Sequence, residues 1–341
     1  MVISSEVVLN QLVIHKIADE GLITSPGKIE SLDEDLNQLL VKYFFKSFKE
    51  EERYHFDLEN EEHDHQVYQI VNQIFEQPDS LFDQSVEMAT LLARLSQNQN
   101  IKEGDFLVCH FEDCVMDDEV TEVIGMFKVE NKETYIKILG QGNDFNIISD
   151  EGISINKLDK GVLIFNTDKE NGYQVLHVDI TNKSNSAQYW QKDFLGIEKT
   201  RDDYFQTQNL INNLQEFAQG TFQHDEKPEK LAFVNQSIDY LKQNPFFNKQ
   251  DFGEKVLQSP ELIDQFENFQ ERKQEENPDL YVDQFDISKP AIKNTKRFIR
   301  SIIKLDKNFH IYVHGNKDQI IRGFDPDKKL NYYTLYFSEE S

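Results

Sequence analysis

The hydrophobic pattern of the first hundred residues predicts one strand followed by three helices. Apolar residues fall on both parities of the segment 7–17, which is typical of a strand covered on both faces. Ser31 and Glu34 have the spacing of a capping box, and apolar residues at helical spacing follow them. Two further amphipathic stretches, one at 64–77 and one starting near Ser80, predict the other helices.

Between residues 105 and 180 the pattern changes to short strands separated by turn residues, such as Asn171-Gly172. The expected strands are 106–111, 120–129, 134–139, 153–158, 161–166 and 173–180. Connections this short favour antiparallel pairing, because parallel neighbours need a long crossover. We therefore expect residues 1–196 to form an α+β lobe in which helices pack on an antiparallel sheet.

Residues 197–341 predict a second lobe, made of helices followed by a short antiparallel β-meander. Among its helices, one is expected to begin at Ser259 as N-cap with Pro260 in its first turn. The run 270–278 is charged and has no apolar residue, so we expect an exposed loop there. The last four strands are expected at 298–305, 309–314, 319–324 and 331–337.

The composition predicts a folded, cytoplasmic protein. Its 26 Phe and 13 Tyr among 341 residues can fill a core, which excludes a disordered chain. No apolar run reaches the ~18 residues of a membrane span, and the first six residues lack the basic leader of a signal peptide. Cys109 and Cys114 lie in a segment expected to be extended, where their odd spacing predicts opposite faces and no disulfide between them.

Charge is distributed unevenly along the chain. The 62 acidic residues outnumber the 36 basic ones, and the formal net charge of −26 excludes a nucleic-acid-binding protein coated in positive charge. Residues 289–341, however, have 11 basic and 6 acidic residues, a net of +5, whereas residues 1–288 have a net of −31. Direct contact with a polyanion is therefore expected only at the carboxy-terminal end.

The basic residues of this end are the candidate nucleic-acid-binding site. The predicted contacts are Lys293, Lys296, Arg297, Arg300, Lys304, Arg322, Lys328 and Lys329. On an extended segment Arg300 and Lys304 share a face, so a ribbon of such residues could contact successive phosphates with little sequence preference. The alternative is the solvated face of an ordinary sheet, which balances an acidic neighbour in the same molecule.

The sequence contains little that indicates catalysis. His55, His63 and His65 lie among carboxylates and are candidate ligands for a divalent transition metal, although their spacing matches no metal signature. We favour the alternative, a solvated acidic loop before a helix N-terminus. The sequence contains no phosphate-binding glycine loop, no G-x-S-x-G elbow and no HExxH pattern. We expect a protein that is not an enzyme and that needs no cofactor.

Four short strings, in order along nearly the whole chain, resemble the bacterial nucleoid-associated protein family of the NdpA/YejK type. They are NQLVIH at 10–15, FLVCH at 106–110, DFLG at 193–196 and FDP at 324–326. The resemblance implies a cytoplasmic nucleoid protein without catalytic residues, which contacts double-stranded DNA or DNA-bound proteins such as a type II topoisomerase. An acidic interaction module recruited through such a partner is the alternative to direct DNA contact. A homo-oligomer is compatible with this sequence.

Overall fold

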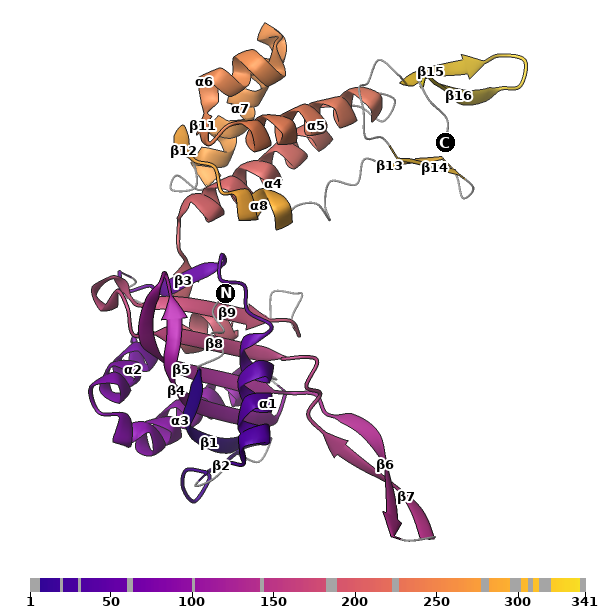
Figure 1. Cartoon of the computed structure of the whole chain (residues 1–341). Coiled ribbons are helices and arrows are strands. Elements are labelled where there is room, and N and C mark those ends of the chain that lie inside the picture. The colour runs from indigo at the N-terminus through magenta and orange to yellow at the C-terminus, as the bar shows by residue number, and fades with distance from the viewer. Residues whose placement is uncertain are drawn as a thin grey trace. The chain divides into compact units, whose positions relative to one another are not determined.

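The structure of the protein is a computed structural model. It describes residues 7–18, 21–29, 32–59, 64–99, 102–141, 144–181, 189–222, 227–276, 282–294, 302–305, 309–312 and 320–337. The chain divides into two compact units, Met1–Thr200 and Arg201–Ser341 (Figure 1). Helices and antiparallel strands make up both units, so the expected α+β class is confirmed.

The first unit is built on an antiparallel sheet in which the described residues supply eight strands. Their spatial order is β10-β3-β9-β8-β5-β4-β1-β2. The strands are β1 (Val8–Ala18), β2 (Gly21–Ile23), β3 (Arg53–Phe56), β4 (Gly104–Met116), β5 (Glu119–Val129), β8 (Lys160–Phe165), β9 (Gln174–Asp179) and β10 (Ile197–Lys199). Successive side chains point to opposite faces, and apolar residues on both faces of the central strands form two cores.

Helices pack on this sheet, as expected for the first lobe, and they cover both of its faces. One face packs against α2 (Gln66–Glu76), α3 (Leu81–Gln99) and the π-helical segment η4 (Tyr189–Leu195). The other face packs against α1 (Glu34–Phe45), where the Phe44 ring stacks on Phe127 with centroids 4.1 Å apart. The single turns η1 (Pro78–Ser80) and η2 (Lys169–Asn171) complete the unit's helical segments among the described residues. The double coverage expected for β1 holds only at Leu12 and Val13, which face the two different cores. Elsewhere one face of the strand is open, since Val8, Asn10, Ile14 and Lys16 are exposed.

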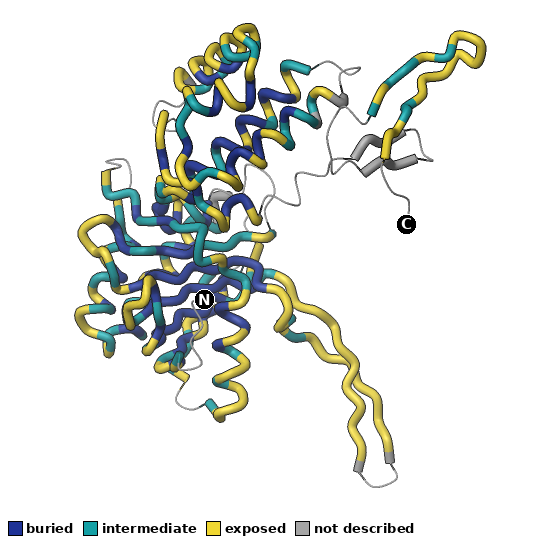
Figure 2. Tube along the Cα trace, turned by 45° about the horizontal axis from the view of Figure 1, so that its top comes forward, coloured by how far each residue is buried: buried dark blue, intermediate teal, exposed yellow. Residues whose placement is uncertain are grey.

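Strands β6 (Glu133–Gln141) and β7 (Asp144–Gly152) form a separate antiparallel hairpin, here called the arm. The arm leaves the sheet between β5 and β8 and is exposed along its length (Figures 1 and 2). The strand predicted at 153–158 is wrong. A hydrogen bond from the Lys157 amide to the Ser154 carbonyl closes a turn there, and the chain returns to the sheet as a loop.

The second unit has a helical core followed by two hairpins. Its helical segments are α4 (Asp203–Thr221), α5 (Lys227–Gln243), α6 (Lys249–Phe252), the π-helical η5 (Gly253–Leu257), α7 (Pro260–Glu276) and α8 (Lys289–Asn294). Two short strands, β11 (Phe246–Asn248) and β12 (Gln284–Asp286), pair beside them. The hairpins are β13 (Ile302–Leu305) with β14 (Phe309–Tyr312) and β15 (Ile320–Asp325) with β16 (Leu330–Leu335). Within the described residues each hairpin is its own two-stranded sheet.

Helix boundaries follow local hydrogen bonds. The N-cap of α1 is Asp33, whose carboxylate accepts from the Leu36 amide at 2.8 Å, while Ser31 lies outside the described residues. At α7 the prediction is confirmed, because the Ser259 hydroxyl accepts from the Leu262 amide at 3.1 Å. The loop predicted at 270–278 is wrong up to residue 276, because its Gln, Glu, Arg and Lys residues are good helix formers and extend α7.

A β-bulge in β4 overturns the prediction that the two cysteines face opposite ways. The register against β5 shifts between Phe111 and Cys114, and Asp113 adopts a left-handed conformation with φ 57°. The extra residue restores the parity, so Cys109 and Cys114 both point into the core beneath α1. Both are free thiols, and burial raises the pKa of Cys109 well above its usual value and that of Cys114 to about 12.

Candidate functional site

The short helix α8 carries Lys293, the first of the predicted nucleic-acid contacts, and also Lys289, another cation of the basic segment. Its buried side chains are Ala291 and Ile292, which attach the helix to the core of the second unit. Lys289 and Lys293 are exposed and stand four residues apart, so they occupy neighbouring turns of the helix. The fold thereby presents two ammonium groups together at the start of the basic segment.

Two more of the predicted contacts lie on the terminal hairpins. Lys304 is on β13 opposite His310, and Arg322 is on β15 opposite Tyr333. Directly opposite residues of antiparallel strands share a face, so Tyr333 stands on the same face as Arg322. A guanidinium and a phenol on one face suit contacts to phosphate and sugar.

The turn between β15 and β16 holds the last two predicted contacts. The Asp325 carboxylate accepts from the backbone amides of Asp327 and Lys328, each at 3.0 Å, and so closes the turn. Lys328 Nζ lies 3.6 Å from the same carboxylate, yet its side chain is 75% exposed. Lys329 adopts a left-handed conformation with φ 54°. The charge of Lys328 is partly balanced within the turn, which lowers its expected contribution to binding.

The centre of the predicted ribbon is not described by the structure. Lys296, Arg297 and Arg300 lie outside the described residues. Cations are therefore found on α8, on β15 and in the β15–β16 turn, while their continuity through 295–301 stays a prediction.

The histidines considered as metal ligands are not brought together among the described residues. His55 lies on β3, where its ring nitrogens contact Thr200 Oγ1 at 3.2 Å and Glu198 Oε1 at 3.3 Å. These contacts tie β3 to β10 at the edge of the sheet. His65 precedes α2 in a left-handed conformation, and His63 lies outside the described residues. No group of three or more His, Cys, Asp or Glu side chains suited to a metal occurs in the part of the chain that the structure describes.

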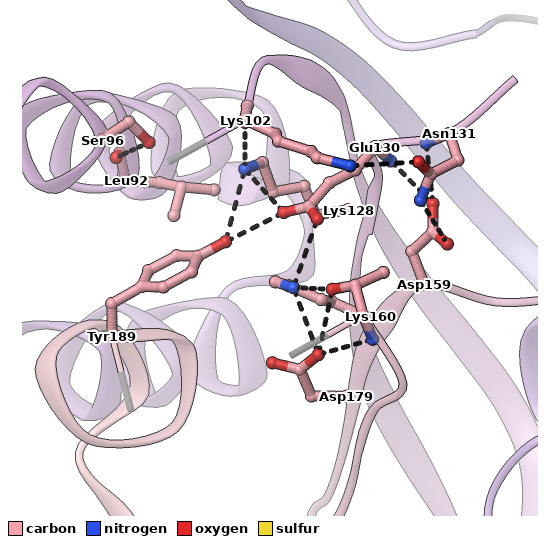
Figure 3. A network of polar contacts seen from close by, with 11 residues as sticks. Leu92, Ser96, Lys102, Lys128, Glu130, Asn131, Asp159, Lys160, Asp179 and Tyr189 are labelled. Atoms are coloured by element: carbon pink, nitrogen blue, oxygen red, sulfur yellow. Dashed lines mark hydrogen bonds and ion pairs between the residues drawn. The ribbon is translucent and has the colours of Figure 1, made fainter. Parts of the chain in front are cut away.

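A buried ionic cluster, which the sequence did not predict, lies at the root of the arm (Figure 3). Lys128 of β5 and Lys160 of β8 stand opposite each other, and both side chains are 0% exposed. The Glu130 carboxylate lies between them, with its oxygens 3.0 Å from Lys128 Nζ and 3.3 Å from Lys160 Nζ. Lys160 Nζ is also 3.1 Å from Asp179. Two buried cations thus meet two almost fully buried carboxylates, and the charges of these four side chains, the centre of what is here called the root network, balance.

Hydrogen bonds satisfy the remaining polar atoms around Lys128 and Glu130. Lys128 Nζ donates to the Lys102 carbonyl at 2.6 Å and to the Tyr189 hydroxyl at 3.3 Å, and that hydroxyl donates to Glu130 at 3.0 Å. Burial lowers the pKa of Lys128, and Glu130 offsets part of this effect. Burial alone would raise the pKa of Glu130, but Lys128 and Lys160 together hold it below its usual value.

Asp159 extends the root network to both ends of the arm. Its carboxylate accepts from the backbone amides of Glu130 and Asn131, each at 2.9 Å, and from the Asn131 side chain at 3.0 Å. Glu130 and Asn131 precede the arm, and Asp159 follows it. The root network therefore fastens the entry and the exit of the arm to each other. The one local signal in the sequence is Lys128 between Phe127 and Val129, a charge inside an apolar strand.

The described residues contain no helix with the length and the apolar character needed to cross a membrane. The model of one protein family, described as nucleoid-associated protein YejK, matches residues 13–329. No match was found among curated proteins or among solved structures. The matched segment spans residues of both compact units and includes every predicted nucleic-acid contact up to Lys329, and it confirms the resemblance seen in the short strings. The chain therefore belongs to the nucleoid-associated protein YejK family.

Proposed function

We propose that this protein is a non-enzymatic component of the bacterial nucleoid that binds double-stranded DNA through its basic surface, defined as the cations between residues 289 and 329. Membership of the nucleoid-associated family supports its location on the nucleoid in the cytoplasm. The observation that carries direct DNA contact is the reversal of charge, from −31 over residues 1–288 to +5 over residues 289–341.

Electrostatic interactions favour DNA binding at the basic surface and oppose it at the rest of the chain. A polyanion is repelled by the acidic body at long range, so an attractive contact needs a local excess of cations. Lys289 and Lys293 are exposed on a helix whose other side is buried, and they can reach phosphates without any change in the fold. Lysine contacts to phosphates position a protein on DNA but do not read bases, so little sequence preference is expected.

A gel-shift experiment at low salt tests the basic surface. The test variant is Arg297→Glu, Arg300→Glu and Lys304→Glu together, and we expect it to abolish the shift of a random-sequence duplex. The matched control is Lys16→Glu, Lys42→Glu and Lys192→Glu, three exposed lysines of the first unit with the same change of charge. The control should shift DNA less strongly than wild type but measurably. Equal binding by the test variant and wild type would remove the basic surface from the proposal.

A second variant uses only residues that the structure describes. Lys289→Glu with Lys293→Glu changes two exposed positions of α8 and leaves its buried residues Ala291 and Ile292 in place. We expect a graded weakening of DNA binding, smaller than that of the triple variant, and unchanged far-ultraviolet circular dichroism. Binding that is insensitive to this variant would assign DNA contact to the later cations only.

The acidity of residues 1–288 supports a second candidate function, an interaction module recruited by a DNA-bound basic protein such as a type II topoisomerase. The β4–β5 turn, where Asp118 and Glu119 are exposed, is one acidic site of such a contact. Titration of a purified bacterial type II topoisomerase, with and without nuclease treatment, separates the two functions. Binding that survives nuclease, together with no gel shift by the protein alone, would favour this second function.

A further inference from the structure

The arm has one face that is apolar and exposed. Its most exposed large side chains are Ile136 (73%), Ile138 (67%), Phe145 (75%) and Ile147 (68%). Ile138 is directly opposite Ile147, and Ile136 and Phe145 lie two positions away on their own strands, so all four side chains share a face. Their partners Ser149 and Gly140 add no charge. Three consecutive cross-strand pairs thus form an uncharged apolar face.

The opposite face of the arm has a different character. Its successive pairs are Tyr135 with Asp150, Lys137 with Ile148, and Leu139 with Asn146. The Tyr135 hydroxyl donates to the Asp150 carboxylate at 3.3 Å. This face mixes charged, polar and apolar side chains as solvated strands do, so the apolar face is a property of one side of the hairpin.

An exposed face of this kind is unfavourable in an isolated chain. Two-stranded hairpins are marginally stable in water, and they gain stability when an apolar face packs against something. The four side chains together expose roughly 450–550 Å² of mostly apolar surface, a patch size that on monomeric proteins often marks an interaction site. The arm is exposed along both strands (Figure 2), so this surface needs a partner from outside the first unit.

Nucleic acid is a poor partner for the apolar face. The face has no cation, and the arm as a whole has four acidic residues against one basic residue, Lys137. The acidic arm would repel a phosphate backbone, and binding to it would leave the apolar side chains exposed to water. The partner must present an uncharged apolar surface of similar size and extended shape.

We propose that the occupant is the apolar face of a second copy of this chain, packed about a two-fold axis. A two-fold contact brings identical patches together, so Ile138 and Ile147 of each copy would lie at the centre. Two such faces bury about 1,000 Å² in total, which meets the lower limit for a specific protein–protein interface. Lys137 and Asp150 lie on the opposite face, and Glu151 lies on the same face but beyond the Ile136–Ser149 pair, so this packing puts no like charges together across its centre.

The root network suits a dimerisation arm. It holds the base of the arm to the sheet through fully buried lysines and through Asp159. Dimerisation through the arms would therefore fix the orientation of each copy's first unit relative to the interface. The proposal does not rest on DNA binding, because the surfaces involved belong to different units of the chain.

Light scattering and sedimentation velocity of the full chain, without DNA, test this proposal. The wild-type protein is expected at about twice its chain mass of 40.1 kDa. Ile138→Thr with Phe145→Thr and Ile147→Thr keeps strand-forming residues but makes the face polar, and should raise the dimer Kd by at least about 100-fold. The control places the same number of threonines on the opposite face, at Tyr135, Leu139 and Ile148, and should stay dimeric.

A deletion of the arm provides a second test, in case the triple threonine variant loses the dimer only because it misfolds. Glu133 pairs with Gly152, so replacing residues 134–151 by Asn-Gly closes the strands with a two-residue turn and leaves the root network intact. This protein should be monomeric, with the thermal stability of the first unit unchanged. A wild-type protein that runs at the single-chain mass at about 50 µM, or a deletion variant that still dimerises, would overturn the proposal.

Discussion

Glu130 is the side chain on which the root network depends most, because its carboxylate is shared by both buried ammonium groups. Glu130→Gln would leave Lys128 and Lys160 facing one remaining carboxylate, that of Asp179. Removing one member of a buried ion pair costs about 3–5 kcal/mol. We therefore expect a marked fall in the urea midpoint of the first unit, followed by the fluorescence of Trp190, the only tryptophan and fully buried in that unit.

Two comparisons make this prediction specific. Glu52→Gln breaks the more exposed pair with Lys49 and should cost less than about 1 kcal/mol. Lys128→Met combined with Glu130→Leu removes one charge of each sign, so its effect should be smaller than the sum of the single changes. A Glu130→Gln protein with the wild-type midpoint would show that the network contributes little to stability.

His177 makes the stability of the first unit depend on pH. Burial lowers the pKa of this histidine from 6.5 to about 4, with Asp179 opposing the shift and Lys199 adding to it. Between these values the unfolded chain binds more protons than the folded one, so stability falls as the pH decreases from 6.5 towards 4. The urea midpoint should be lower at pH 5 than at pH 7.

The variant His177→Phe should reduce this difference between pH 7 and pH 5. It keeps an aromatic ring beside Tyr54, whose centroid lies 5.2 Å away, but it takes up no proton. Burial also lowers the pKa of His15, so part of the pH dependence should persist in the variant. Equal pH dependence in wild type and variant would assign the effect to other groups.

Among the elements, the turn before β9 holds the edge of the sheet in place. Gly172 has φ 88°, and a Cβ there would lie 2.3 Å from the Phe56 carbonyl oxygen of β3. The Phe56 amide also donates to the Gly172 carbonyl at 2.9 Å. Gly172→Ala must therefore strain the turn or displace β3, and we expect a loss of more than about 2 kcal/mol by the same urea measurement. Gly27→Ala, which would place its methyl in open space, is the control and should be nearly neutral.

Elements with a strong local pattern were predictable, while those defined by distant partners were not. The stripes of α1, α2 and α3 mark helices because each buries one face, whatever it packs against. By contrast, β3 and β10 are only a few residues long, and they are strands because they add to the edge of the sheet beside β9. The bulge at Asp113 likewise depends on the register with β5, so simple alternation placed the cysteines on the wrong faces.

The same distinction applies to the candidate site: its net charge can be read from the sequence, whereas the features that depend on strand pairing cannot. The contrast in charge between the two parts of the chain is a sum over residues, so the sequence alone reveals it. The burial of Lys128 and Lys160 depends on β5 pairing with β8 across the inserted arm, and only Lys128, between two apolar residues, shows any local sign of it in the sequence. The apolar face of the arm needs the register of β6 against β7 before its four side chains can be placed together.

At the scale of the whole molecule, a basic surface on an acidic chain makes any DNA binding strongly dependent on salt. Seven cations lie between residues 289 and 307, and contact of all seven with phosphates would give a slope of log K against log salt of about −6. Lys289→Gln with Lys293→Gln should reduce the magnitude of this slope by about 1.8 and weaken binding equally on unrelated sequences, because the lost contacts are to phosphates. Lys16→Gln with Lys192→Gln is the matched control and should leave the slope unchanged. If the slope is the same in all three proteins, Lys289 and Lys293 do not contact phosphates, whereas affinity that differs between unrelated duplexes would indicate contacts to bases.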